Sequence, residues 1–162
     1  FLGIKSDIHV LEKVFYAFGI FSRMVTDEEK DEKIFELLIK YLGLMDTLAS
    51  GGKNMKMDIV TAGFLIKLLD EMGYGIEVDK CVKCRGKLKP HGNFFSPEQG
   101  GILCENCGKS LLRKIKIGHN SIKIIRLFLA NKIDNFSKIE AEEKTIRNLK
   151  SVISEEINWI TA

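Results

Sequence analysis

Apolar residues recur at helical spacing along most of this 162-residue chain. Steps of three and four separate them in five segments, which predicts five amphipathic α-helices. The residues that we expect to face the core are, in chain order, Ile8, Leu11, Phe15 and Phe18; Ile34, Leu38, Tyr41, Met45 and Leu48; Phe64, Leu65, Leu68, Leu69 and Met72; Ile122, Ile124, Ile125, Leu127, Phe128 and Leu129; and Ile146, Leu149, Ile153, Ile157 and Ile160. Such helices can bury one another, so the pattern predicts a mainly α helical bundle.

Short polar residues and glycine mark where several of these helices begin and end. Ser6-Asp7, Asp31 and Ser121 lie at the start of apolar stripes, and residues of these types cap helix N-termini. Gly73 follows the third stripe directly and is typical of a helix C-terminus. The acidic interval 26–33 separates the first two stripes, and we expect it to be a solvated loop.

One stretch of the chain has a different character from the rest. Both prolines lie between the second and third cysteines, and five of the 14 glycines fall in residues 81–108. Proline breaks helices and glycine supplies turns, so this stretch is predicted to be compact and rich in turns. The expected organisation is a helical domain in two parts, residues 1–78 and 111–162, around an insert at residues 79–110.

The four cysteines of the insert form two Cys-x-x-Cys pairs with nineteen residues between them. Each pair directs two thiolates at one point, and a small β-hairpin between the pairs closes a tetrahedral site, which is the zinc-ribbon pattern. The predicted ligands of one Zn²⁺ are Cys81, Cys84, Cys104 and Cys107. Four thiolates leave no coordination position open, so the zinc is expected to be structural. The competing interpretation is two disulfides, or free thiols without a function.

No catalytic motif accompanies the cysteines. His9, His91 and His119 are scattered, and the chain has no Ser–His–Asp arrangement and no phosphate-cradling glycine loop. We therefore expect a protein that is not an enzyme and takes no small-molecule substrate. No apolar run approaches the roughly 18–20 residues that span a bilayer, so no membrane association is expected either.

Positive charge is concentrated around the cysteines. Residues 80–116 contain nine basic and two acidic residues, a net charge of +7, whereas the remaining residues sum to −4. We expect a basic face that binds nucleic acid or a partner, formed by Lys83, Arg85, Lys87, Lys89, Lys109, Arg113, Lys114 and Lys116. The alternative is that these side chains only keep a small metal-binding insert soluble.

Three runs of residues resemble one protein family. They are residues 34–42 (IFELLIKYL), residues 64–75 (FLIKLLDEMGYG) shortly before Cys81-Val-Lys-Cys84, and residues 95–107 (FSPEQGGILCENC). In this order they resemble the second helix, the central helix and the two halves of the zinc ribbon of RecO, the bacterial recombination-mediator family of DNA repair. The resemblance extends over essentially the whole chain.

The resemblance implies a function that spacing alone does not. RecO proteins carry an N-terminal OB-fold barrel that binds single-stranded DNA, followed by a helical domain with a zinc ribbon, and this chain resembles the part after the barrel. The family anneals complementary strands, binds RecR and the C-terminal tail of single-stranded DNA-binding protein, and helps to load RecA. The resemblance thus implies a cytoplasmic, nucleoid-associated bacterial protein whose DNA contacts lie mainly in the barrel.

An acidic tail that ends in phenylalanine needs an apolar groove beside a basic group. Candidates by position are Phe64, Leu65, Lys67 and Leu68, although the apolar three also suit the core of the bundle. A second hypothesis for the whole chain is a zinc-stapled protein-interaction scaffold with no direct contact to nucleic acid.

Overall fold

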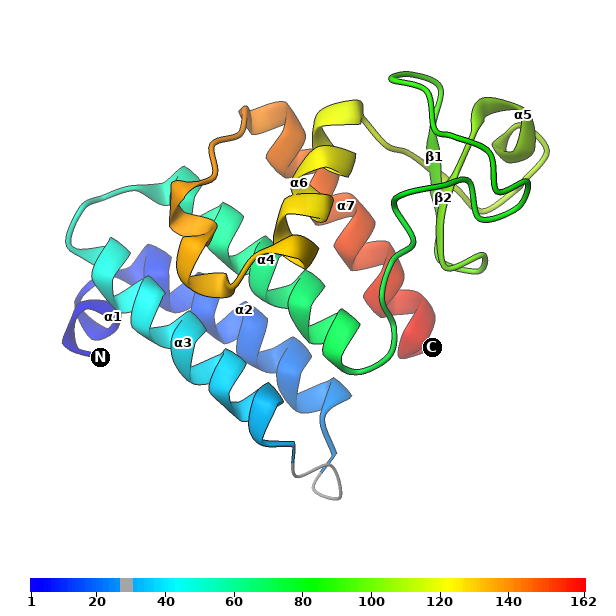
Figure 1. Ribbon diagram of the computed structural model, residues 1–162. Coiled ribbons are helices and arrows are strands. Elements are labelled where there is room, and N and C mark those ends of the chain that lie inside the picture. The colour runs from blue at the N-terminus through cyan, green and yellow to red at the C-terminus, as the bar shows by residue number, and fades with distance from the viewer. Residues whose placement is uncertain (27–30) are drawn as a thin grey trace.

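The computed structural model describes residues 1–26 and 31–162 and is built mainly from helices (Figure 1). The helices are α1 (Leu2–Ser6), α2 (Ile8–Met24), α3 (Glu32–Ala49), α4 (Asn54–Glu71), α5 (Glu105–Gly108), α6 (His119–Ala130), the 3-10 helix η1 (Ile133–Lys138) and α7 (Glu143–Ile160). The strands are β1 (Phe94–Ser96), β2 (Gly101–Leu103) and β3 (Ile115–Lys116). The predicted class, a helical bundle with a small β element, is confirmed. Residues 27–30 of the predicted loop lie outside the described residues.

Helix α4 is the central element of the bundle. It packs against α2, α3, α6, α7 and η1, and Figure 1 shows it running between these helices. Its residues from Ile59 to Ile66 are all buried, because every side of this helix meets a neighbour. The sequence pattern identified only the second half of α4, since an all-round apolar helix shows weak one-sided periodicity.

The helix expected first along the chain is present, but its predicted core face is wrong. Ile8, Phe15 and Phe18 are 65%, 69% and 45% exposed. The buried residues of α2 are Val10, Val14, Ala17, Ile20 and Met24. Both sets have helical spacing and lie on different faces, so periodicity alone could not decide which one is inside. The predicted cap is confirmed at Asp7, whose side chain accepts a hydrogen bond from the His9 N–H at 2.9 Å.

The remaining stripes fit the structure more closely. Asp31 caps α3 and accepts from the Lys33 N–H at 2.8 Å, and Gly73 follows α4 with φ +84°. The predicted cap at Ser121 is wrong, because α6 begins two residues earlier, after Gly118. The Ser121 hydroxyl instead donates to Oδ1 of Asn148 at 2.7 Å and so joins α6 to α7.

A three-stranded antiparallel sheet of order β2–β1–β3 lies to one side of the bundle (Figure 1). Phe94 pairs with Leu103 on one side and with Lys116 on the other, and Glu77 pairs with Gly101. We call residues 77–117 the ribbon unit, because this paired segment extends past both ends of the expected 79–110 insert. Four of its buried residues, Val78, Phe95, Ile102 and Ile117, belong to the same hydrophobic cluster as the helices.

Candidate metal centre and its basic surroundings

The first cysteine pair lies on a tight turn in the ribbon unit. The Arg85 N–H donates to the carbonyl of Cys81 at 2.8 Å, and the Cys81 N–H donates to the carbonyl of Gly86 at 2.9 Å. Arg85 adopts φ 61°, a left-handed conformation that costs a residue with a side chain about 1–2 kcal/mol. The turn is therefore held in a strained form that places Cys81 and Cys84 on one side of the loop.

The second pair spans the short helix α5. Cys104 follows β2 with φ −69° and ψ 166°, and its carbonyl accepts from the Gly108 N–H at 2.9 Å. Gly108 contacts the ring of Phe94 so closely that a side chain at this position would collide with it. The end of β2 thus positions Cys104 at the site, and the first turn of α5 places Cys107 beside it.

The two turns bring all four cysteine sulfurs together. Every pair of Sγ atoms lies within 4.8 Å, and Cys84 and Cys104 are 3.9 Å apart. Four sulfurs around one metal with bonds of about 2.3 Å would lie about 3.8 Å from one another in a tetrahedron. The cysteines are not disulfide-bonded, so of the two sequence-based interpretations the geometry supports a metal site.

The protonation of the thiols fits the same conclusion. Burial opposes ionisation of Cys81, but backbone N–H groups of Cys104, Cys84 and Lys83 together lower the pKa of its thiol to about 6. Hydrogen bonding to Cys104, followed by burial, raises the pKa of the Cys107 thiol to about 12. Four adjacent sulfurs do not all ionise unaided, and a metal cation supplies the missing positive charge. The four residues could therefore hold a metal ion.

The basic side chains around the cysteines differ in how they are engaged. Three of them lie within 4.0 Å of a carboxylate, in the pairs Arg85–Glu77, Lys109–Glu105 and Arg113–Glu155. Lys114 is half-buried and donates to the carbonyl of Lys109 at 2.7 Å. Of the eight basic residues predicted to form the face, those that are exposed and have no carboxylate that close in the described part of the chain are Lys83, Lys87, Lys89 and Lys116. These four are the most available to an anionic ligand.

The groove predicted on α4 is wrong. Phe64, Leu65 and Leu68 are 0%, 2% and 0% exposed, because these side chains form the core against the surrounding helices. The fourth candidate, Lys67, is half-buried and donates to the carbonyl of Leu129 at 3.0 Å. Of the four, Leu65 alone touches a hollow on the described surface, the one between α2 and α7, and Phe64 and Leu68 are closed off in the core.

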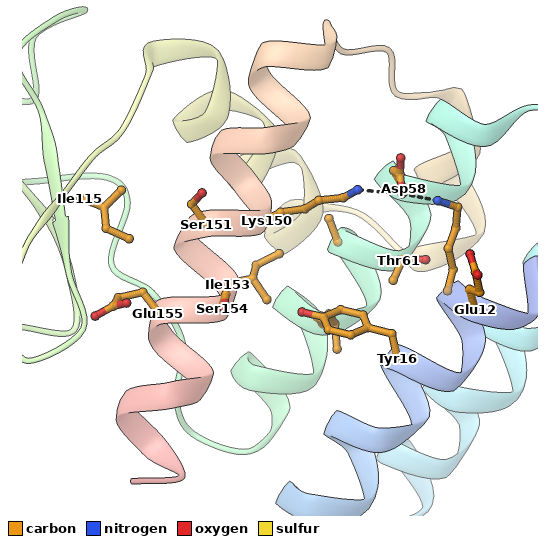
Figure 2. A pocket seen from close by; sticks show the side chains of 13 residues that line it. Glu12, Tyr16, Asp58, Thr61, Ile115, Lys150, Ser151, Ile153, Ser154 and Glu155 are labelled. Atoms are coloured by element: carbon orange, nitrogen blue, oxygen red, sulfur yellow. Dashed lines mark hydrogen bonds and ion pairs between the residues drawn. The ribbon is translucent and has the colours of Figure 1, made fainter. Parts of the chain in front are cut away.

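A hollow does exist on another side of α4, between α2 and α7. It has a volume of about 680 Å³, and α4 forms its floor (Figure 2). Lys13 from α2 and Lys150 from α7 both reach Asp58 on the floor, with N–O distances of 2.7 and 3.1 Å. Figure 2 shows Tyr16 projecting from α2 into the same space. The hollow is thus a groove with mainly apolar surface that carries two lysines and the carboxylates of Glu12, Asp58 and Glu155.

Sequence reasoning missed two features of α7. Arg113 of the ribbon unit places its guanidinium 5.2 Å from the ring centroid of Trp159 while it pairs with Glu155. Glu156 is 5% exposed, although a charged residue on an amphipathic helix is expected to face water. No sequence motif predicts either feature, because each depends on tertiary contacts between elements that are far apart in the chain.

None of the described helices is long and apolar enough to cross a membrane. The only cluster of three or more potential metal ligands that the described residues form is the four cysteines.

The family model described as Recombination protein O C terminal matches residues 6–159. The chain is 29% identical over 160 residues to the DNA repair protein RecO of Dehalococcoides mccartyi, covering 99% of this chain and 60% of that protein. It is 28% identical over 153 residues to the DNA repair protein RecO of Halalkalibacterium halodurans, covering 94% of this chain and 57% of that protein. The chain thus spans about 60% of the length of these relatives. No solved structure matches it.

Proposed function

Because this chain belongs to the RecO family by the match of its residues 6–159, we propose that it serves DNA repair and recombination as the metal-bearing part of a mediator that binds DNA. The observation that carries the proposal is the ribbon unit itself. Its four converging cysteines lie in residues 80–116, whose net charge is +7 with neutral cysteines and about +5 with four thiolates around one Zn²⁺, on a body whose remaining residues sum to −4. This division directs a polyanion to the ribbon unit and away from the bundle.

We infer that the metal is one structural Zn²⁺. A donor set of four cysteine sulfurs with near-tetrahedral spacing is the one that structural zinc prefers, and it leaves no position for a substrate. Bound zinc would hold the two turns together and fix the orientation of the lysines that they carry. In this proposal the protein binds and positions other molecules and catalyses no reaction.

The proposed DNA contacts are the exposed lysines Lys83, Lys87, Lys89 and Lys116. Their ammonium groups are not neutralised by a carboxylate within 4.0 Å in the described part of the chain, so they can replace the counterions of phosphate groups. Arg113 is a weaker candidate than its charge suggests, because Glu155 and Trp159 already engage it.

The partners implied by the resemblance, RecR and the tail of single-stranded DNA-binding protein, remain proposals for this chain, as do RecA loading and nucleoid association. The groove between α2 and α7 offers apolar surface to an aromatic end, but its charge does not favour an acidic tail. Glu12, Asp58 and Glu155 line it together with Lys13 and Lys150, and both lysines already pair with Asp58.

The DNA proposal is tested by reversing charge on the ribbon unit. We expect the triple variant Lys83→Glu, Lys87→Glu and Lys89→Glu to bind a fluorescent 20-nucleotide single strand at least tenfold more weakly. The slope of log affinity against log salt should fall by about 2, because three phosphate contacts each contribute about 0.7. Fluorescence anisotropy at a series of salt concentrations measures both quantities.

A matched variant controls for net charge. Lys5→Glu, Lys33→Glu and Lys123→Glu change three exposed lysines of the bundle and alter the total charge equally. If both triple variants weaken binding by the same factor, the ribbon unit is not the DNA surface. If the unmodified chain does not bind DNA at all, the scaffold hypothesis replaces the proposal.

A further inference from the structure

The loop between α5 and β3 displays a leucine completely to solvent. Leu112 is 102% exposed, the highest value among the large hydrophobic side chains of residues 1–26 and 31–162. Burying a leucine side chain stabilises a fold by roughly 1.5–3 kcal/mol. Leu112 does not contribute this stabilisation, because its side chain stays in water. A single exposed leucine is ordinary on a mobile loop, so the question is whether this loop is held in place.

The loop is anchored on both sides of Leu112. The N–H of Leu111 donates to the carbonyl of Gly108 at 3.2 Å. On the other side, the ammonium of Lys114 bonds the carbonyl of Lys109 at 2.7 Å and lies 5.0 Å from the ring centroid of Phe94. These contacts leave Leu112 as the tip of a fixed turn, with its side chain pointing away from the protein.

The residue after Leu112 joins this loop to an exposed aromatic ring on α7. Arg113, the neighbour of Leu112, donates from Nε to Glu155 at 2.6 Å and covers one side of the Trp159 ring. Figure 2 shows Glu155 projecting from α7 toward the side of the ribbon unit on which Ile115 lies. Trp159 remains 41% exposed, so part of its ring is open to a ligand. Leu112 lies in the basic segment 80–116, in which its neighbours Arg113 and Lys114 are held by Glu155 and by the carbonyl of Lys109.

We propose that Leu112 and Trp159 form a base-contacting platform for single-stranded nucleic acid, with a base stacked on the open part of the Trp159 ring and Leu112 packed against it. The net positive charge of residues 80–116 suits the phosphates of the strand. Base stacking is sequence-tolerant, and it requires bases that are not paired in a duplex. The platform therefore favours a single strand over a duplex, which lysines alone do not. The inference rests on the proposed DNA binding and adds to it which side chains read the bases.

The chain offers a direct readout, because Trp159 is its only tryptophan. We expect a 20-nucleotide oligothymidine to quench the intrinsic fluorescence of the 162-residue chain at saturation, and a duplex of equal length to quench it much less. The concentration dependence of quenching should match that of binding measured by anisotropy.

Two leucine-to-serine substitutions distinguish a specific contact at Leu112 from nonspecific binding to exposed apolar side chains. Leu112→Ser should weaken oligothymidine binding at least fivefold while the salt slope stays unchanged, because an apolar contact releases no counterions. Leu127→Ser removes a 44% exposed leucine from α6 and should leave binding as it was. Trp159→Ala should weaken binding about tenfold, as expected for loss of one stacked base.

The outcomes distinguish this inference from the function on which it rests. If the chain binds DNA and the triple lysine variant weakens binding, but saturating oligothymidine leaves the fluorescence of Trp159 unchanged, the platform is refuted and the basic surface stands. The platform is also overturned if Leu112→Ser and Leu127→Ser bind equally well. Absence of any DNA binding overturns both.

Discussion

Glu156 is a carboxyl group that the fold buries without compensation. It is 5% exposed on α7, and its Oε2 atom has no hydrogen-bond partner among the described residues. Burial raises the pKa of this carboxyl to about 7 from the ordinary value of 4.5. The folded protein therefore holds a proton at Glu156 that the unfolded chain releases at lower pH.

This residue makes the stability of the protein depend on pH. Below pH 4.5 both states are protonated and Glu156 carries no penalty. As pH rises from 4.5 to 7, the free energy of unfolding falls by roughly 3 kcal/mol in total, since a unit of pKa corresponds to about 1.4 kcal/mol. We expect Glu156→Gln to remove this loss, so that the variant is more stable than the parent at pH 8 and similar to it at pH 4.

Urea unfolding at several pH values measures this difference. Glu143→Gln on the same helix is the control, because Glu143 is exposed and its pair with Arg147 is worth only about 0.3–0.5 kcal/mol. A stability difference between Glu156→Gln and the parent that does not change between pH 4 and pH 8 would show that Glu156 titrates normally.

At the scale of elements, the packing around α4 depends on a glycine. A β-carbon at Gly63 would lie 2.6 Å from Cε2 of Phe136 on η1 and 2.8 Å from Cε1 of Phe128 on α6. The two rings pack on each other with their centroids 4.8 Å apart. Gly63 thus lets three elements meet where a side chain would push them apart.

Alanine substitutions at two helical glycines test this packing. We expect Gly63→Ala to lower the free energy of unfolding by about 1–3 kcal/mol, because the rings must shift to admit the methyl group. Gly43→Ala on α3 has the same chemistry with nothing within 4 Å, and it should raise stability by about 0.8–1 kcal/mol through helix propensity. Denaturant unfolding of both variants gives the comparison, and equal effects would contradict the close packing.

The sequence predicts the type of most elements better than the face that each one buries. The stripe of α7 is right because this helix has a single apolar face, and that of α3 is right although Phe35 and Ile39 are apolar and exposed. On α2 two apolar faces compete, and only the position of α4 decides that Val14 is inside and Phe15 outside. The groove predicted on α4 is wrong for the same reason, because Phe64 and its neighbours lie on a helix that is surrounded by other helices.

The metal ligands could be predicted because their chemistry is encoded locally. Two Cys-x-x-Cys turns need only a connecting hairpin to converge, and the structure places their sulfurs within 4.8 Å. The platform at Leu112 could not be predicted in this way, because Arg113 and Trp159 are 46 positions apart and meet only through tertiary packing.

At the scale of the whole molecule, the ribbon unit is not an independent module. Phe95 and Ile102 share one hydrophobic cluster with the helices, and Arg126 of α6 donates two hydrogen bonds to the carbonyl of Val78, at 3.0 and 2.6 Å. The chain therefore combines a basic unit that could hold a metal ion with an acidic body into which it is packed. This arrangement fits a protein that presents a charged surface to DNA while other faces remain free.

The metal centre is the claim on which the rest depends, and native mass spectrometry of the chain, purified without chelator, tests it most directly. We expect one zinc ion per chain with four cysteines that are not oxidised, and Cys104→Ser should lose the ion. A metal-free chain carrying two disulfides, or a Cys104→Ser variant that keeps a full complement of zinc, would rule out the proposed metal centre.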